Sequence, residues 1–325
     1  MAALVKVLSI DGGGIRGVIP ATVLSEIEKR TQARIASLFD LIAGTSTGGI
    51  LALGLVKPST ADPGEPQYSA SELVGLYKQE GRRIFDRSLW HRIVALDNLI
   101  DEKYEATGLE AVLSQYFGEA PLSKAVTEAL VTSYELETRE PWFFARHKAL
   151  ADPAFDFPMR FVARATSAAP TFFEPEELTT TSPHGGLVDG GVFANNPAMC
   201  AYVEAKKLWP DAELLVVSLG TGQHTRPIHY KDAKGWGLAL WAKPILSVVF
   251  DGVSDTVDHQ MSILCASRHG QPRYYRFQTE LDIGSDDMDN ATATNIAALE
   301  QKARVLISEH DQQLDTLCQA LTASS

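Results

Sequence analysis

Residues 4–17 read LVKVLSIDGGGIRG, a short apolar run that leads directly into a glycine-rich loop. The β-branched residues Val5, Val7 and Ile10 favour a buried strand, and the three glycines that follow favour a turn. From Val18 onward the apolar side chains recur at helical spacing. The stretch therefore predicts a strand, a tight loop and a helix in succession, which is the repeating unit of an α/β fold.

A second unit of the same kind follows at once. Residues 39–43 predict a short strand, residues 44–49 (GTSTGG) a turn, and residues 50–56 an apolar helix. Beyond a loop at residues 57–69, strand and helix patterns continue to alternate, with strands expected at 129–133, 214–219 and 273–277 and helices at 70–83, 104–117, 160–169, 198–208, 237–268 and 296–321. This alternation predicts a mostly parallel sheet flanked by helices on both faces, a three-layer α/β/α architecture.

The composition is that of an ordinary globular chain. Of the 325 residues, 45% are hydrophobic and 22% are charged, which excludes collagen-like, coiled-coil and wholly disordered chains. We find no internal repeat and no break in composition. We therefore expect a single domain over residues 1–325, with the functional motifs within 4–222 and a helical extension at 223–325 packed on it.

The charge balance limits the partners that the chain is expected to have. It carries 29 basic and 41 acidic residues, a net charge of −12, which argues against general attraction to nucleic acid. The three cysteines have no metal-ligand spacing and are typical of reduced thiols, and no signal peptide or membrane-spanning run is visible. We expect a cytoplasmic protein that makes transient peripheral contact with a membrane surface.

The glycine loop admits two interpretations. Residues 12–17 formally satisfy GxGxxG, so a dinucleotide-binding Rossmann-like module is one of them. That site needs an acidic residue at the end of the second strand, and the nearby acid, Asp40, falls inside the predicted strand. Converging backbone amides at a helix N-terminus can equally bind a phosphate or a developing oxyanion.

The turn at residues 44–48 (GTSTG) fits the G-x-S-x-G pattern of a nucleophile elbow. The required context is present, because an apolar strand precedes the turn and an apolar helix follows it. Ser46 is therefore a candidate nucleophile. A glycine loop at the end of the adjacent strand would supply the oxyanion hole that acyl transfer needs.

A serine nucleophile also needs a base, and two arrangements are open. In the order Ser…Asp…His, the histidine would follow Asp189, but none of the five candidates stands in a recognisable loop: His224, His229, His259, His269 and His310. Alternatively, Asp189, which is followed by Gly190 and Gly191, acts alone. A carboxylate is a poor base in water, so this second arrangement requires a desolvated cleft that raises its pKa.

Three segments in this order, residues 11–17 (DGGGIRG), 44–49 (GTSTGG) and 189–191 (DGG), resemble the signatures of the patatin-like phospholipases. Residues 165–173 (ATSAAPTFF) resemble a further segment that precedes the aspartate in that family, so the resemblance spans about residues 4–222. It implies hydrolysis of fatty-acyl esters of phospholipids or lysophospholipids by a Ser-Asp dyad. Residue by residue, it implies Ser46 as nucleophile, Asp189 as base, and the backbone of Gly12, Gly13 and Gly14 as oxyanion hole.

Four other features have a functional and a plain interpretation. Arg16 could contact an oxyanion or a phospholipid phosphate, or pair with a nearby carboxylate. The arginine-rich residues 82–92 could meet lipid headgroups or a small anionic regulator, as in a nucleotide-regulated membrane-degrading effector of the same family, or form a solvated face. Residues 236–250 could form a lipid-facing lid, although a buried helix is the favoured interpretation. The aspartates at 282–289 lack the glycine and glutamate of a calcium loop, so we expect no metal and no cofactor.

Overall fold

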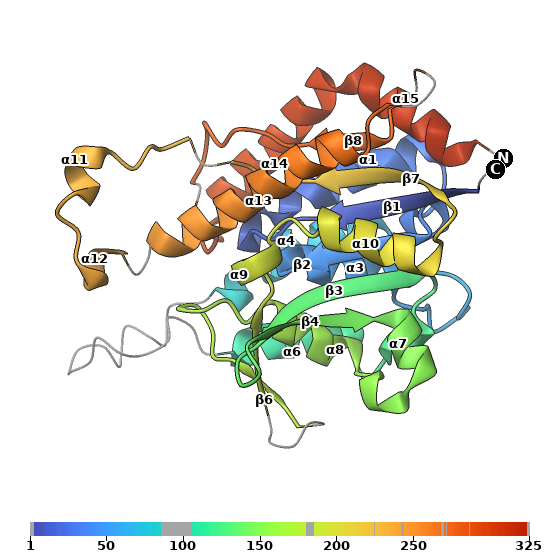
Figure 1. The fold of residues 1–325 in the computed structure, drawn as a ribbon, viewed down its shortest axis with the longest axis horizontal. Coiled ribbons are helices and arrows are strands. Elements are labelled where there is room, and N and C mark those ends of the chain that lie inside the picture. The colour runs from blue at the N-terminus through green and yellow to red at the C-terminus, as the bar shows by residue number, and fades with distance from the viewer. Residues whose placement is uncertain are drawn as a thin grey trace.

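The computed structural model describes residues 3–85, 106–179, 185–223, 225–241, 244–267, 270, 272–285 and 287–323. Its strands form one sheet that lies between two layers of helices (Figure 1). The strands run in the order β5-β6-β3-β2-β1-β7-β8, and β4 pairs with β3. Their bounds are β1 Leu4–Ile10, β2 Leu41–Thr45, β3 Glu128–Glu135, β4 Glu140–Ala145, β5 Glu176–Leu178, β6 Gly185–Asp189, β7 Glu213–Leu219 and β8 Tyr274–Phe277.

The centre of the sheet is parallel and one side of it is mixed. Strands β3, β2, β1, β7 and β8 run in the same direction, whereas β4 and β6 run antiparallel to β3 and β5 runs antiparallel to β6. The predicted mostly parallel sheet with helices on both faces is thus confirmed. Strands β4, β5 and β6 were not anticipated from the sequence.

Alternate residues of the central strands enter two separate cores. In β1, Leu8 and Ile10 pack with α1 (Val18–Thr31) and α3 (Thr47–Val56), whereas Val5 and Val7 face α10 (Ala198–Leu208) on the other side. Strands β2 and β7 alternate in the same way. Because both faces are covered, these strands read as continuous apolar runs in the sequence.

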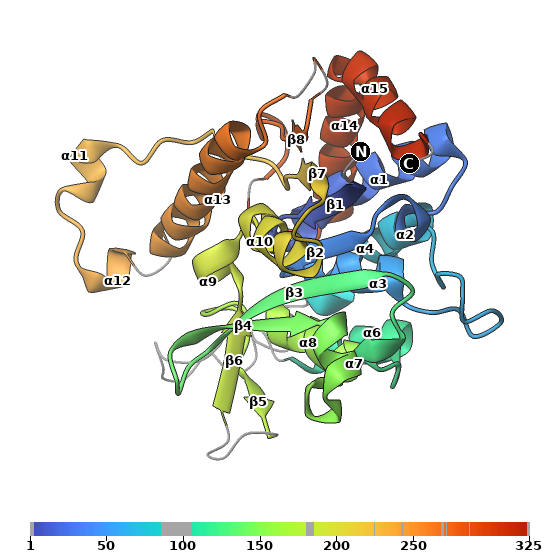
Figure 2. The same ribbon diagram turned by 45° about the vertical axis from the view of Figure 1, so that its right-hand side comes forward.

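The helices divide between the two faces of the sheet (Figure 2). The face with α1 and α3 also carries α4 (Ala70–Ile84), α6 (Thr107–Phe117) and the C-terminal helices, while α13 (Pro244–Leu264) packs beside α10 on the other face. The remaining helices are α2 Ile35–Leu38, α7 Arg146–Ala151, α8 Met159–Thr166, α9 Gly191–Ala194, α11 Tyr230–Ala233, α12 Leu238–Trp241, α14 Ala293–Glu309 and α15 Asp311–Thr322.

The long helix expected at residues 296–321 is in fact two helices. The backbone of His310 leaves helical geometry (φ −106°, ψ 22°), so α14 ends before it and α15 begins after it. Both helices pack on α1, and Arg30 of α1 forms ion pairs of 2.7 Å with Asp311 and with Asp315 at the start of α15. An apolar stripe of constant spacing does not reveal such a break, because both helices use the same stripe to cover α1.

Asp40 also lies elsewhere than expected. It precedes β2 instead of lying inside the strand, and its carboxylate accepts a 2.7 Å hydrogen bond from the backbone N–H of Lys6. The residue therefore joins the start of β2 to β1 at the amino end of the strands. It is remote from the end at which the glycine loop lies.

Residues 225–241 leave the body of the molecule. Figures 1 and 2 both show α11 and α12 held away from the sheet and from the other helices, and α13 returns the chain to the body. None of the helices in the described ranges is both long enough and apolar enough to span a bilayer.

Candidate active site

Ser46 occupies a sharp turn between β2 and α3. Its φ of 56° and ψ of −125° lie in a region that non-glycine residues rarely adopt, which is the strained geometry of a nucleophile elbow. The two flanking glycines are required by close packing: a Cβ on Gly44 would lie 2.1 Å from the carbonyl oxygen of Gly48, and a Cβ on Gly48 would lie 2.1 Å from that of Ile10. The pattern at residues 44–48 therefore describes a real geometric constraint.

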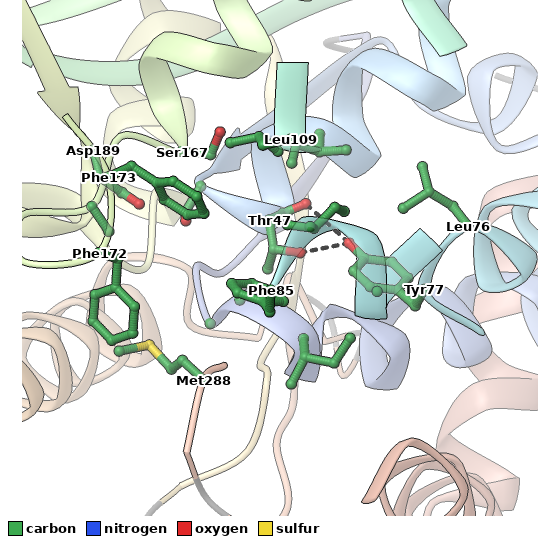
Figure 3. Close-up of a pocket in the computed structure, with 18 of the residues that line it drawn as sticks. Thr47, Leu76, Tyr77, Phe85, Leu109, Ser167, Phe172, Phe173, Asp189 and Met288 are labelled. Carbon is green, nitrogen blue, oxygen red and sulfur yellow. Dashed lines mark hydrogen bonds between the residues drawn. The ribbon is translucent and has the colours of Figure 1, made fainter. Parts of the chain in front are cut away.

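Buried hydroxyl groups hold this turn in place. The N–H of Ser46 donates to Oγ1 of Thr166 (2.9 Å), which in turn donates to the carbonyl oxygen of Thr132 (2.7 Å). On the other side, Oγ1 of Thr47 and the hydroxyl of Tyr77 form a 2.5 Å hydrogen bond (Figure 3). The strained backbone is thus fixed from both sides, as a preorganised nucleophile requires.

Asp189 reaches the same place by way of β6. Thr45, the last residue of β2, pairs with Thr132 of β3, and Asp189, the last residue of β6, pairs with Ser133. Strand β4 pairs with residues 130–135 of β3, so it occupies one edge of β3 at both Thr132 and Ser133. Since a strand has only two edges, β2 and β6 must share the other one and end against consecutive residues of it.

The Asp189 carboxylate is buried, with only 1% of the residue exposed. Its Oδ1 accepts a 2.7 Å hydrogen bond from the N–H of Gly191, whereas its Oδ2 has no hydrogen-bond partner within the described part of the chain. Burial raises the pKa of Asp189 to about 7, while the nearby Ser46 hydroxyl and the Gly191 N–H act in the opposite direction. The carboxyl group can therefore gain or lose a proton near neutral pH.

Ser46 and Asp189 both line the same cavity (Figure 3). Its wall is mostly apolar and is built from α3, α4, α6, α13, the segment after α8 and the loop after β8. Besides Ser46, Asp189 and the glycine loop, the lining includes Ile50, Leu76, Tyr77, Ile84, Phe85, Leu109, Phe172, Phe173, Phe250 and Met288. Of the histidines considered as alternative bases, those that the structure describes, His229, His259 and His310, do not line this cavity; His224 and His269 lie outside the described residues.

The three loop glycines differ in what their amides can do. The N–H of Gly12 donates to the carbonyl oxygen of Asn195 (2.9 Å), so it is already engaged. Gly13 and Gly14 line the cavity, and in the described ranges no acceptor is bonded to either N–H. Of the three predicted oxyanion-hole residues, Gly13 and Gly14 therefore have an N–H available to a ligand, whereas the N–H of Gly12 ties the loop to the turn after α9.

Arg16 lies behind the glycine loop and is absent from the cavity lining. It is buried, and its Nε donates to the carbonyl oxygen of Gly13 (3.3 Å). Burial lowers its pKa to about 10, against the charges of Asp251, Asp11 and Asp287. These contacts fit the structural interpretation of Arg16, in which the guanidinium supports the loop from within.

Comparison with known sequences decides the family. The sequence model described as patatin-like phospholipase matches residues 8–202, which include the glycine loop, the elbow and the Asp189 turn. The chain belongs to the patatin-like phospholipase family. This patatin-like protein is 31% identical to patatin-like protein 2 of Oryza sativa subsp. indica over 96% of its own length and 86% of the relative's.

Other relatives support the same family assignment. The protein is 32% identical to patatin-like protein 2 of Arabidopsis thaliana (94% of this chain, 83% of the relative) and 31% identical to patatin group J-1 of Solanum tuberosum (94% and 84%). Among solved structures, VipD from Legionella pneumophila aligns over 95% of this chain and 67% of its own, at 13% identity and a TM-score of 0.39. That value is too low to carry weight, so the family assignment rests on the sequence matches.

Membership of the family supports lipid acyl hydrolase activity in general. It favours neither the dinucleotide-binding module nor the nucleotide-regulated effector. Of the arginine-rich residues 82–92, Arg82 and Arg83 lie in the last turn of α4, and residues 86–92 lie outside the described ranges. Sequence reasoning assigned no role to Thr166 or Tyr77; the first stands within the family-like segment 165–173, and no local pattern marks the second.

Proposed function

We propose that this patatin-like protein hydrolyses fatty-acyl ester bonds of phospholipids or lysophospholipids, with Ser46 as nucleophile and Asp189 as base. The observation that carries the proposal is the buried Asp189 carboxylate, which has a pKa of about 7 and lies beside Ser46 in an apolar cavity. A base with a pKa near the working pH combines a large unprotonated fraction with useful proton affinity.

The reaction proceeds in two steps in this proposal. Asp189 accepts the hydroxyl proton of Ser46 while Oγ bonds to the ester carbonyl carbon, and the same proton then passes to the departing alcohol oxygen as the ester C–O bond breaks. A water molecule next gives a proton to Asp189 and attacks the acyl-enzyme. The fatty acid leaves, and the proton returns to Ser46. One carboxyl group thus serves both steps.

The amides of Gly13 and Gly14 are the proposed oxyanion donors. Both residues line the cavity, and the N–H of Gly12 is excluded by its bond to Asn195. Backbone donors of this kind are rigid before the substrate arrives, so they stabilise the developing charge without reorganisation. The anchoring of the loop through Gly12 and Arg16 keeps them in position.

The cavity wall indicates the substrate class. Apolar side chains from α4 and α6, among them Leu76 and Leu109, form the part that lies away from Asp189 (Figure 3). A mostly apolar cavity with a few polar groups at one end suits a fatty-acyl chain whose ester lies at Ser46. The same cavity offers no cationic side chain to a headgroup within the described lining.

A second serine in the same cavity supplies the control for the test. Ser167 also lines the cavity, and its hydroxyl donates to the carbonyl oxygen of Ala163 (2.6 Å). We expect Ser46→Ala to lose fatty-acid release from mixed phospholipids and lysophospholipids by about 10⁴-fold or more, and Ser167→Ala to stay within about tenfold of the parent. Circular dichroism would check that both variants fold.

Two outcomes would contradict the proposal. The first is release that survives in Ser46→Ala but disappears in Ser167→Ala. The second is near-full activity of Asp189→Asn together with loss of activity on replacement of one of the five histidines, which would assign the base to a triad. If no lipid is cleaved but short soluble esters are, the substrate class is wrong and the dyad stands.

A further inference from the structure

The segment that leaves the body of the molecule exposes apolar and aromatic side chains. We call residues 225–241 together with 244–248 the projecting arm. Tyr230 is 76% exposed and Leu240 60% exposed, and Ile228, Ile245 and Val248 are also exposed. The buried helix expected over residues 236–250 is thus wrong for most of its length, because Phe250 is the residue that reaches the core.

The arm has its own aromatic cluster at some distance from the sheet. The rings of Trp236, in the link between α11 and α12, and Trp241, at the end of α12, meet edge to face with centroids 5.2 Å apart. Tryptophan and tyrosine have an apolar ring with a polar tip, and they gather where a protein meets the headgroup region of a bilayer. The arm therefore presents the residue types of an interfacial segment.

The charge of the arm is opposite to that of the chain. Its described residues include Arg226, Lys231 and Lys234 against the single acidic Asp232, in a protein of net charge −12. Lys231 and Lys234 are exposed on the part that projects furthest. Acidic side chains also line the base of the arm, among them Asp251 and Asp287, whose charges act on the buried guanidinium of Arg16.

The base of the arm adjoins the proposed catalytic cavity. A second cavity lies between the arm and the body and is lined by residues of both. Phe172 and Met288 line both this cavity and the one that holds Ser46 (Figure 3). Helix α13 makes a further connection, because its first turns expose Ile245 and Val248 and, two residues beyond Val248, place Phe250 in the catalytic cavity.

We propose that the projecting arm docks on the surface of an anionic lipid bilayer and that acyl chains pass from there, between Phe172 and Met288, into the catalytic cavity. The docking of the arm is inferred from its exposure, charge and aromatic content. The passage of acyl chains into the cavity rests on the proposed function. A lipid hydrolase must take its substrate out of a bilayer, and an apolar route from the membrane keeps the acyl chain out of water.

A bilayer fits the arm better than a second copy of the chain does. Two copies would bring the basic tips of the arms together if the contact were symmetric, which costs energy. Protein interfaces are also depleted in lysine at their centre, whereas a polar face rich in lysine beside tryptophan and leucine is typical of helices that lie in a membrane interface.

The first test measures binding without catalysis. The Ser46→Ala protein is mixed with vesicles of phosphatidylcholine alone or of phosphatidylcholine with phosphatidylglycerol, and the bound fraction is measured by sedimentation. We expect tighter binding to the anionic vesicles, weakened by salt. Tyr230→Ser/Leu240→Ser should weaken this binding by about tenfold or more, and Lys231→Glu/Lys234→Glu by about 20-fold or more on anionic vesicles alone.

Matched controls lie elsewhere on the surface. Leu150 on α7 is 57% exposed, close to the value for Leu240, and Lys124 and Lys207 are exposed lysines outside the arm. We expect Leu150→Ser and Lys124→Glu/Lys207→Glu to leave vesicle binding within about twofold of the parent, apart from the effect of net charge that any lysine reversal shares. Equal losses in the arm variants and their controls would overturn the proposal.

Two further outcomes separate this proposal from its alternatives. If the parent is a dimer by sedimentation velocity and the arm variants are monomers that bind vesicles like the parent, the arm is an interface between copies and the membrane proposal is wrong. The arm variants are also prepared with the native Ser46, and their hydrolysis of a short soluble ester is measured. The rate should stay within about twofold of the parent. Loss of docking with intact ester hydrolysis supports the proposal, whereas absent ester hydrolysis in the parent itself refutes the proposed function and leaves the docking result standing.

Discussion

Ser46 and Asp189 meet because the strands that lead to them end against consecutive residues of one edge of β3. Thr45 pairs with Thr132 and Asp189 with Ser133, so β2 and β6 approach the same point of that edge from opposite directions. The parallel part of the sheet supplies the elbow, and the antiparallel part supplies the carboxylate. The chain thus brings together two side chains that are 143 positions apart in the sequence.

The proton affinity of Asp189 predicts the pH dependence of hydrolysis. Its pKa is about 7 because the group is buried, and the base must be unprotonated to accept the serine proton. We therefore expect kcat/KM for a soluble ester to fall about tenfold per pH unit below pH 7 and to level off above it. A profile that stays flat between pH 5 and pH 9 would show that Asp189 does not titrate in the reaction.

The same shift predicts that the buried Asp189 carboxylate destabilises the fold at high pH. The folded pKa of about 7 lies above the ordinary value of 3.8, so the stabilising effect of the protonated group is complete below pH 4 and is lost as the pH rises through 7. Asp189→Asn stays neutral, and Oδ1 can still accept from Gly191. The free energy of unfolding of Asp189→Asn, relative to that of the parent, should therefore increase by about 2–3 kcal/mol between pH 5 and pH 8.

Urea unfolding at the two pH values measures this difference. The exposed Asp211 provides the control, since Asp211→Asn removes a carboxylate that stays in water in the folded state. The control should unfold like the parent at both pH values. An Asp189→Asn protein with no more stability than the parent at pH 8 would mean that the carboxylate is not desolvated.

Close packing at the elbow predicts a sharp difference between two helical glycines. Gly48 in α3 has no room for a side chain, because a Cβ would lie 2.1 Å from the carbonyl oxygen of Ile10, whereas Gly75 in α4 meets no atom closer than 3.6 Å. Gly48→Ala should lose at least about 3 kcal/mol of stability or fail to fold. Gly75→Ala should be neutral or more stable by up to about 1 kcal/mol, and thermal melts of the two proteins would compare them.

The apolar end of the cavity predicts a change in chain-length preference. Leu109 of α6 lines the cavity, and Leu113, one turn further along the same helix, is buried in the core outside it. Leu109→Phe should shorten the space for the acyl chain. We expect the ratio of kcat/KM for a decanoyl ester to kcat/KM for a butyryl ester to fall by about tenfold, because about one to two methylene groups of the longer chain would no longer be buried. Leu113→Phe carries the same overpacking cost and should leave the ratio unchanged; an equal change in both would remove the cavity from chain recognition.

The local units of the fold could be predicted from the sequence. The unit that starts at Leu4 and the elbow around Ser46 each combine a strand, a turn and a helix whose patterns are short-range. Both units formed, although β2 begins two residues later and α3 three residues earlier than expected. The family resemblance added the pairing of Ser46 with Asp189, which no local spacing contains. What the residues alone supplied was the condition that a lone carboxylate must be buried to act as a base.

Long-range strand pairing and tertiary contacts could not be predicted from the sequence. Strand β4 consists of the proline-containing run EPWFFA at 140–145, whose pairing with β3 forms only when the chain folds back. The engagement of the Gly12 amide by Asn195 likewise depends on a turn distant in sequence. The exposure of the projecting arm could not be read from its apolar residues, because apolar patterning is the same for a helix that faces a core and one that faces a membrane.

The most direct measurement is covalent labelling with a fluorophosphonate probe, followed by mass spectrometry of the peptides. The account predicts one adduct, on the peptide that contains Ser46, formed at least about 100-fold more slowly in Asp189→Asn because the serine has lost its base. Ser167, in the same cavity, should remain unlabelled. Labelling of another serine, or labelling of Ser46 at an unchanged rate without the Asp189 carboxylate, would contradict the account.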